Sequence, residues 1–218
     1  MSPRGHLWAR GNLAIAGLAL SGMLAITAPA GATTLRKMDL PELVDAAERI
    51  VHARAVTSSV YWDPTETQIY TDTTFDVVSE AKGAGSSTLT VTLLGGTIGD
   101  VEMRAEGGPI FSLGEEVVLF TVSRPDGNND LVGYTQGVMR VVVEDAGDKI
   151  AVSEVPLGIN LVQLGGPAPM PVRPSPMRAP LGVLVEEIRQ MVLNGQPAGP
   201  VISKTPETDP VAPGDEIQ

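Results

Sequence analysis

The side chains that could take part in catalysis are mostly carboxylates and hydroxyls. The sequence has no cysteine and two histidines, of which only His52 lies outside the first ten residues. A Ser-His-Asp triad needs a histidine that is held by an acid and faces a hydroxyl, whereas His52 stands in a strand-like run. We expect it on the outer face of that strand, beside Arg54. One histidine without cysteine leaves a structural zinc site short of its usual ligands, so we expect no cofactor and no metal site.

Two neighbouring carboxylates, Glu115 and Glu116, follow Gly114 and precede the apolar run from Val117 to Phe120. We interpret them as the polar rim of a strand, where charged side chains discourage edge-to-edge pairing. In this interpretation Phe111 and Leu113 point into the core, and no catalytic residue is expected. Carboxylates are numerous enough that a hydrolase with two acids stays open as an alternative.

A second acidic group places Asp126, Asn128 and Asp130 at alternating positions, as at the start of a calcium-binding loop. The glycine that such a loop needs next is replaced by Leu131, and no glutamate closes the loop. The favoured interpretation is a turn between two strands. Stabilisation of this turn by calcium remains a hypothesis.

Three aromatic residues, Tyr61, Trp62 and Tyr70, lie close together in the sequence. Tyrosine and tryptophan combine a large contact area with a polar group, so these residues are our candidates for a ligand-binding lip. The alternative is that they form cross-strand pairs that hold a long hairpin together.

The chain that must position these residues begins with a segment typical of export. Arg4 and Arg10 precede an uncharged apolar run from Leu13 to about Ile26, followed by TAPAGATT. This pattern predicts a signal peptide over residues 1–32, cleaved after Ala32 or, as second choice, after Ala30. The alternative is a membrane anchor, but the run is shorter than the roughly 20 residues that a spanning helix needs. We therefore expect an exported protein, periplasmic or extracellular, without membrane insertion after cleavage.

The rest of the chain is expected to be mainly β. Asp39, Pro41 and Glu42 predict the start of a short N-terminal helix, and the period changes to two from Ile50 onward. The first two strand-like runs are expected to form a long hairpin, and Gly95-Gly96 is expected to end the strand after them. Six to eight short strands up to about Val155, without cysteine, favour a small antiparallel barrel of OB-fold type. The predicted parts are a barrel domain with this helix over 33–164, a proline-rich linker over 165–180, an amphipathic helix over 181–195 and a disordered acidic tail over 196–218. The C-terminal helix either docks on the barrel or binds a partner.

The order of these segments resembles a family of exported bacterial proteins and domains of uncharacterised function. The resemblance runs from about Glu48 to Val143 and is carried by ERIVHARAVTSSVYWD, IYTDTTFDVVSEAKG, TLTVTLLGG, GGPIFSLGEEVVLFTV and YTQGVMRVVV. Lys82-Gly83, Gly95-Gly96 and Gly114-Glu115 match the family pattern, while Ala53 stands where the family often has glycine. More distantly, the plan is similar to the OB-fold barrel of netrin-like domains and tissue inhibitors of metalloproteinases. Those inhibitors use an N-terminal cysteine, so no inhibitory residue can be carried over to this chain.

The charge of the chain limits the classes of molecule that it is expected to bind. The net charge is −11, and the predicted signal peptide contains two arginines and no acid, so the exported chain is more negative still. Nucleic acids and anionic lipids are polyanions and are poor partners for such a surface. We expect a non-catalytic interaction module that binds a protein or another ligand of unknown kind, in an unknown oligomeric state. A protease inhibitor or protease-associated domain and a carboxylate-dependent hydrolase are the alternatives.

Overall fold

The computed structural model describes residues 33–153, 159–164, 168–173 and 175–195. The predicted signal peptide and the predicted acidic tail lie outside these residues. The described part is mainly β, with two α-helices and one short 3-10 helix. The elements are β1 (Thr33–Arg36), α1 (Leu40–Ala46), β2 (Arg49–Trp62), β3 (Ile69–Lys82), β4 (Thr88–Ile98), β5 (Val101–Arg104), β6 (Glu116–Ser123), β7 (Asn129–Leu131), η1 (Tyr134–Gly137), β8 (Val138–Val143), β9 (Lys149–Ser153), β10 (Ile159–Gln163), β11 (Met170–Val172), β12 (Arg178–Pro180) and α2 (Leu181–Asn194).

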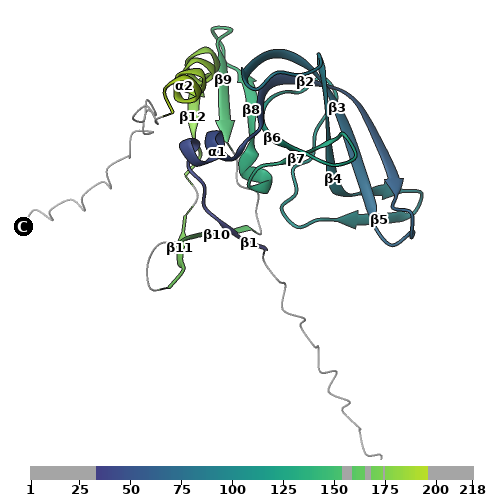
Figure 1. Cartoon of the computed structure of the whole chain (residues 1–218). Helices are drawn as coiled ribbons and strands as arrows, with labels where there is room; N and C mark the ends of the chain where they lie inside the picture. Colours follow the sequence, from purple (N-terminus) through teal and green to yellow (C-terminus); the bar gives the residue numbers. More distant parts are fainter. Residues whose placement is uncertain (1–32, 154–158, 165–167, 174, 196–218) are drawn as a thin grey trace, which may run out of the picture. The chain divides into compact units, whose positions relative to one another are not determined.

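Most strands belong to one strongly curved sheet with the order β12-β9-β8-β6-β2-β3-β4-β5 (Figure 1). Its longest part is the predicted hairpin of β2 and β3, which pair from Ile50–Lys82 to Trp62–Ile69. The short strand β7 pairs antiparallel with β6 and, through Val91 and Asn129, parallel with β4. The strands β2, β3, β4, β7 and β6 are thus each hydrogen-bonded to the next.

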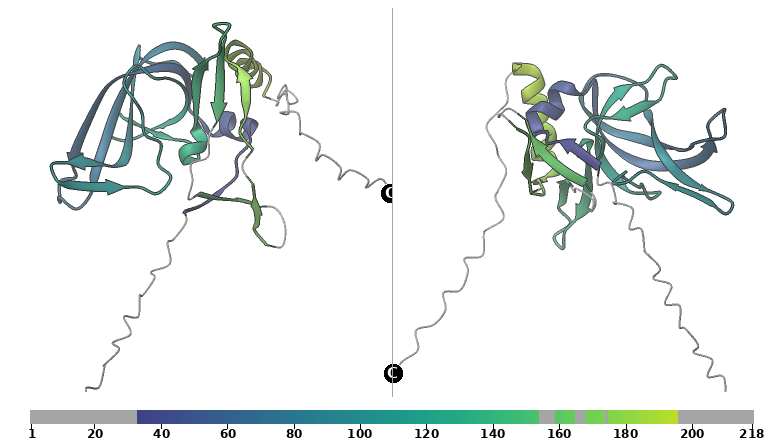
Figure 2. Two further views of the ribbon diagram at one scale, coloured as in Figure 1. Left: turned by 180° about the vertical axis from the view of Figure 1, so that it is seen from behind. Right: turned by 90° about the horizontal axis from the view of Figure 1, so that it is seen from below.

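Two hydrophobic cores lie on opposite faces of β2 and β6. Side chains alternate between the faces of a strand, so Val51 and Ala53 enter one core while Ile50 enters the other. The first core lies on the concave side of the long strands and contains Phe75, Leu89, Val91, Val117 and Leu119. The second lies between the sheet and the helices α1 and α2, which Figure 2 shows on the side of β8, β9 and β12. Because β6 contributes to both cores, its residues Val117–Thr121 are all buried, as its two-sided apolar pattern predicts.

Both helices pack their apolar faces into this second core. The helix α1 begins after Asp39, whose carboxylate accepts a hydrogen bond from the Glu42 N–H at 3.0 Å, and Glu42 returns the interaction to the Asp39 N–H at 2.9 Å. In this capping box the N–H groups of Asp39 and Glu42 each donate to the other residue's carboxylate, so two backbone donors that the helix itself leaves unpaired are satisfied. The helix α2 runs to Asn194, with Gly195 in the left-handed conformation that ends many helices. Its buried side chains are Leu181, Leu184, Val185, Glu187, Ile188 and Met191, so α2 docks on the sheet.

Segments that the sequence assigns to the proline-rich linker contribute two edge strands. The strand β12 pairs with β9, and β11 joins β10 and β1 in a separate three-stranded sheet. Gln136 ties the start of the chain to η1, because its side-chain oxygen accepts from the Met38 N–H and its amide donates to the Arg36 carbonyl. Proline is tolerated in such edge strands because they leave one side unpaired.

The glycine pair Gly95-Gly96 does not end β4, which the sequence pattern had suggested. The strand pairs with β3 up to Leu94 and with β5 from Gly95 onward, so the pair marks the corner where β4 changes partners. Both glycines have positive φ, at 111° and 147°. A Cβ atom on Gly96 would meet Val60 Cγ1 at 2.5 Å and Thr71 Oγ1 at 2.8 Å. Glycine is needed here because the corner packs directly onto the inner face of β2 and β3.

Candidate functional site

The curved sheet encloses a pocket of about 460 Å³ where β2, β3 and β4 extend beyond the first core. Ligand sites for small molecules usually span about 300–1,000 Å³, so the volume suits a small organic molecule. The walls come from the inner faces of β2, β3 and β4, and the segment from Glu102 to Phe111 covers the space. This pocket is the candidate functional site.

One wall of the pocket carries a row of hydroxyl groups. Ser58 and Thr73 are paired across β2 and β3, and Thr71 lies two residues further along the same face. Thr71 donates a hydrogen bond of 2.6 Å to the Gly95 carbonyl, which leaves the lone pairs of its oxygen available.

The Thr73 hydroxyl is the unusual member of this row. The residue is 2% exposed, yet among the described residues its hydroxyl has no hydrogen-bond partner. Thr73 is one of the residues that line the pocket. Buried polar groups are usually hydrogen-bonded. Thr73 is therefore a polar group positioned for a partner inside the cavity.

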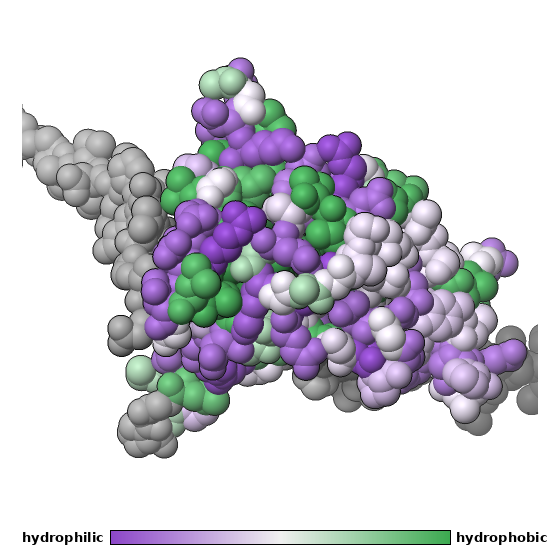
Figure 3. All heavy atoms as spheres, turned by 45° about the horizontal axis from the view of Figure 1, so that its top comes forward, coloured by the Kyte–Doolittle hydropathy of each residue, from purple (hydrophilic) through white to green (hydrophobic). Residues whose placement is uncertain are grey.

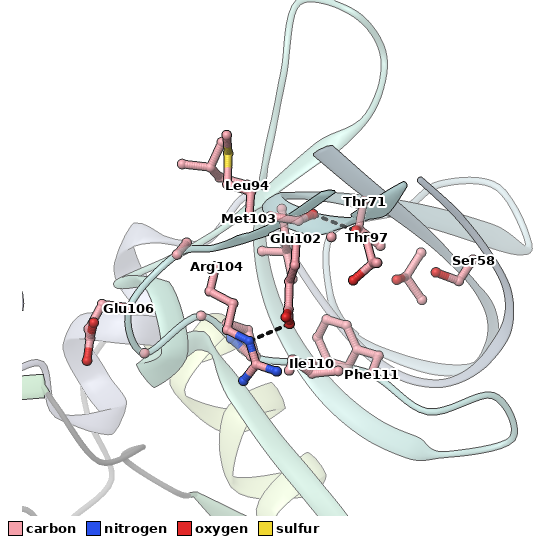
Figure 4. A pocket seen from close by; sticks show the side chains of 18 residues that line it. Ser58, Thr71, Leu94, Thr97, Glu102, Met103, Arg104, Glu106, Ile110 and Phe111 are labelled. Atoms are coloured by element: carbon pink, nitrogen blue, oxygen red, sulfur yellow. Dashed lines mark hydrogen bonds and ion pairs between the residues drawn. The ribbon is translucent and has the colours of Figure 1, made fainter. Parts of the chain in front are cut away.

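The opposite side of the pocket is mainly apolar. Phe111 packs edge-to-face on Phe75 with 5.0 Å between ring centroids, which fixes the ring at the inner end. Leu93, Met103 and Ile110 add aliphatic and thioether surface. Figure 4 shows the hydroxyl side chains of Ser58 and Thr71 together with Phe111 around the same space.

The lining also contains three charged residues, Glu102, Arg104 and Glu106, and Figure 4 shows the first two beside Ile110 and Phe111. Glu102 and Arg104 form an ion pair of 2.6 Å on β5, with half and about three quarters of their side-chain surface exposed. Figure 4 shows Glu106 apart from the other labelled side chains. The lining thus consists of hydroxyl, backbone and apolar groups together with this ion pair and Glu106.

The three predicted lip residues do not form one surface. Tyr61 and Tyr70 are directly paired across β2 and β3, and their rings stack with centroids 6.1 Å apart. Trp62 is paired with the buried Ile69 and therefore points to the other face. The cross-strand alternative describes the two tyrosines, and none of the three residues lines the pocket.

The outer face beside the tyrosines is held by a compact polar network. Asp72 accepts hydrogen bonds from Thr92 at 2.6 Å, Tyr61 at 3.2 Å and Asn128 at 3.1 Å. Burial of the hydroxyl, followed by the nearby charge of Asp72, raises the pKa of Tyr61. Through Asn128 this network fixes the β6–β7 turn onto β3 and β4.

The acidic side chains of the turn that was compared with a calcium-binding loop form ion pairs with Arg124, and its Asn128 forms hydrogen bonds. Arg124 pairs with Asp126 at 3.1 Å and with Asp130 at 2.9 Å, and Asn128 belongs to the network of Asp72. Among residues 33–153, 159–164, 168–173 and 175–195, no group of three acids or histidines is arranged to hold a metal ion. The turn joins β6 and β7, in line with the favoured interpretation.

His52 and Glu116 form a cluster that the sequence analysis missed. His52 shares its face with Arg54 as expected, but it is 6% exposed and its Nε2 lies 2.9 Å from Glu116 Oε2. Glu116 also pairs with Arg54 and with Lys149. Hydrogen bonds from Lys149, His52 and Arg54 outweigh burial and lower the pKa of Glu116 to about 2. The prediction of an exposed histidine on the outer face was wrong, because β6 brings Glu116 directly opposite Arg54, on the face that His52 shares.

The neighbouring Glu115 holds the turn before β6 in place. It pairs with Arg140, whose other nitrogen donates to the Ile110 carbonyl at 3.0 Å. The Glu115 carboxylate also accepts from the Ser112 N–H at 3.0 Å, so it braces the turn before β6. Leu113 is 64% exposed, and the expectation that it enters the core was wrong, whereas Phe111 packs against that core.

Comparison of the chain with protein-family models, curated proteins and solved structures finds no match. Neither of the two described α-helices is long and apolar enough to cross a lipid bilayer. The function proposed below is therefore inferred from the geometry of the pocket.

The sequence contained one signal for the pocket. Ile69, Thr71, Thr73, Phe75 and Val77 share one face of β3, and a face with two large apolar residues at one end and threonines in its middle is unusual for a closed core. The signal is weak, because threonine is common in strands for reasons of shape alone.

Proposed function

We propose that this protein is an exported, non-catalytic binding module that holds a small ligand in the pocket under the β4–β5 corner. The observation that carries the proposal is the cavity of about 460 Å³ with the unpaired Thr73 hydroxyl in its wall. A hydroxyl group that the sheet already holds in position lowers the free-energy cost of ordering the site when a ligand binds.

The module is proposed to be a barrel of OB-fold type. The pairings β2-β3, β3-β4, β4-β7, β7-β6 and β6-β2 support this, because they connect five strands in a ring. OB-folds are five-stranded, partly open Greek-key barrels. The single residue pair between β4 and β7 would be the weakest part of such a ring.

Export is proposed from the N-terminal pattern of residues 1–32, a basic start followed by an uncharged apolar run and small residues. An acidic protein suits an aqueous compartment and disfavours polyanionic partners. On the face drawn in Figure 3, hydrophobic residues lie in separate groups between hydrophilic ones, which also suits a protein surrounded by water.

A non-catalytic role is favoured because Glu102 and Glu115, two acids at or near the pocket, are held in ion pairs with arginines. A two-carboxylate hydrolase needs one carboxyl group to act as an acid and another to act as a base or nucleophile. Glu102 is paired with Arg104, and Glu115 with Arg140. The inhibitor alternative has no specific contact in its favour among the described residues.

The experiment is a fragment screen by two-dimensional amide NMR with chemically diverse, uncharged and charged compounds. Binding compounds should shift the amide signals of Thr71, Thr73 and Gly96, which lie in the pocket wall. Signals of α2 should stay in place. A screen in which compounds shift only residues outside the pocket would overturn the proposed site, and conversion of compounds into products would overturn the non-catalytic role.

A further inference from the structure

The lining of the pocket also indicates what kind of ligand it takes, an inference that rests on the proposed function. We infer that the ligand is an uncharged, mainly apolar small molecule that carries one hydrogen-bonding group, which meets the Thr73 hydroxyl.

Charge is the first discriminating property. Of the charged side chains in the lining, Glu102 and Arg104 are paired with each other and Glu106 is exposed. A charged ligand group inside the pocket would lose its hydration without gaining an opposite charge, which is strongly unfavourable. An uncharged ligand avoids this loss.

Apolar contact is the second property. Leu93, Met103, Ile110 and Phe111 offer a surface that a hydrocarbon or aromatic body would cover. Ile110 is 74% exposed without a ligand, so a molecule in contact with it would remove apolar surface from water. Phe111 is held by Phe75, which means that its ring is available without rearrangement.

The hydrogen-bonding group is the third property. The Thr73 hydroxyl can donate or accept, and the Thr71 oxygen, whose proton is used by the Gly95 carbonyl, can only accept further bonds. A ligand hydroxyl, amide or secondary amine can form a hydrogen bond with the Thr73 oxygen, whereas a pure hydrocarbon would leave Thr73 without a partner. Leaving a buried polar group unpaired weakens binding.

The test uses two fluorescent probes with the same ring skeleton. N-phenyl-1-naphthylamine is uncharged and carries one N–H group, and 8-anilinonaphthalene-1-sulfonate adds a sulfonate. We expect the uncharged probe to bind the full chain about tenfold or more tightly than the sulfonate, because Arg104, the cation of the lining, is already paired with Glu102. Equal affinity of the two probes would overturn the uncharged class.

The position of the bound probe is tested with single cysteines, which are unique because the chain has none. Ser58→Cys places a thiol at the pocket, and Ser59→Cys places one on the opposite face of the same strand, where Ser59 is paired with Asp72. After folding, reaction with N-benzylmaleimide should abolish probe binding in the first variant and leave it unchanged in the second. Equal binding by both labelled variants would overturn the pocket as the site, and thus the proposed function as well.

The role of Thr73 is tested by the nearly isosteric Thr73→Val, with Thr74→Val as its matched control on the outer face. Loss of one hydrogen bond should weaken binding of N-phenyl-1-naphthylamine about fivefold in Thr73→Val only. Equal affinities in the two variants would overturn the hydrogen-bonding group but leave the uncharged, apolar class in place.

Discussion

The Glu116 carboxylate contacts three basic side chains. One of its oxygens contacts His52 and Lys149, and the other contacts Arg54. Its side chain is 12% exposed, so these interactions are only partly screened by water. A carboxylate held in this way contributes stability only while it is ionised.

Glu116→Gln should therefore lower the free energy of unfolding at pH 7 by about 2–3 kcal/mol. The folded-state pKa of Glu116, about 2, lies below its ordinary value of 4.5. The stabilisation is complete above pH 4.5 and is lost as the pH falls toward 2. Urea unfolding at pH 7 and pH 3 measures this, and the difference between wild type and variant should shrink at pH 3. Glu66→Gln, in the exposed β2–β3 turn, is the control and should change neither value; a pH-independent difference would contradict the ion-pair explanation.

Single residues show why the sequence predicted the site poorly. The composition showed that His52 has no cysteine and no second histidine near it to share a metal ion. Its contact with Glu116, however, joins residues 64 positions apart and depends on the register between β2 and β6. The same holds for Thr73, whose inward position follows from the alternation of β3, while the empty space in front of it depends on the distant segment Glu102–Phe111. The period-two pattern of a strand predicts which face of the sheet a side chain lies on, but it does not predict which residues lie across from that face.

At the scale of elements, strand patterns were more informative than loop residues. The β2–β3 hairpin, the burial of β6 on both faces and the turn between β6 and β7 all follow from period-two patterning and turn chemistry. The Gly95-Gly96 pair was misinterpreted as a strand end, because glycine also occurs at a bend within a strand. Distinguishing the two requires the pairing partner, β5, which is too short and too exposed to have a clear pattern.

Gly96→Ala should destabilise the protein by about 2–4 kcal/mol. The added methyl group would collide with Val60 Cγ1 and Thr71 Oγ1, and the backbone φ of 147° disfavours any side chain. Gly99→Ala is the matched control, since Gly99 also has a positive φ but no atom within 4 Å of the added carbon. It should lose only about 1 kcal/mol. Urea unfolding of both variants provides the measurement, and equal losses would show that packing at the corner does not matter.

At the scale of the whole molecule, the two cores share β2 and β6 as a common wall. Neither core is complete without this wall, so we expect one cooperative unfolding transition for both. The composition predicted a β-rich fold that stands without disulfides, while the division into two cores was not evident from the sequence. It depends on α1 and α2, which are separated by more than 130 residues and lie against the same core.

Removal of α2 should disrupt the protein as a whole. A chain that ends at Pro180 would expose Ile50, Val118 and Phe120 to water, because α2 covers the core to which they belong. We expect aggregation or a loss of more than about 10 °C in Tm. A chain that ends at Gly195 is the control and should keep the wild-type Tm, since the described core residues end at Met191. Differential scanning calorimetry measures both, and a stable, soluble chain ending at Pro180 would contradict the shared-wall argument.

The two-sided burial of β6 also bears on how this protein can be re-engineered. A strand with no free face tolerates few replacements, so a library randomised across Val117–Thr121 would consist mostly of inactive clones. The cover of the pocket, from Glu102 to Phe111, contributes only Phe111 and Pro109 to the tightly packed parts and leaves most of its other side chains exposed. New ligand preferences should accordingly be sought by diversifying that cover, with the wall kept as an invariant frame.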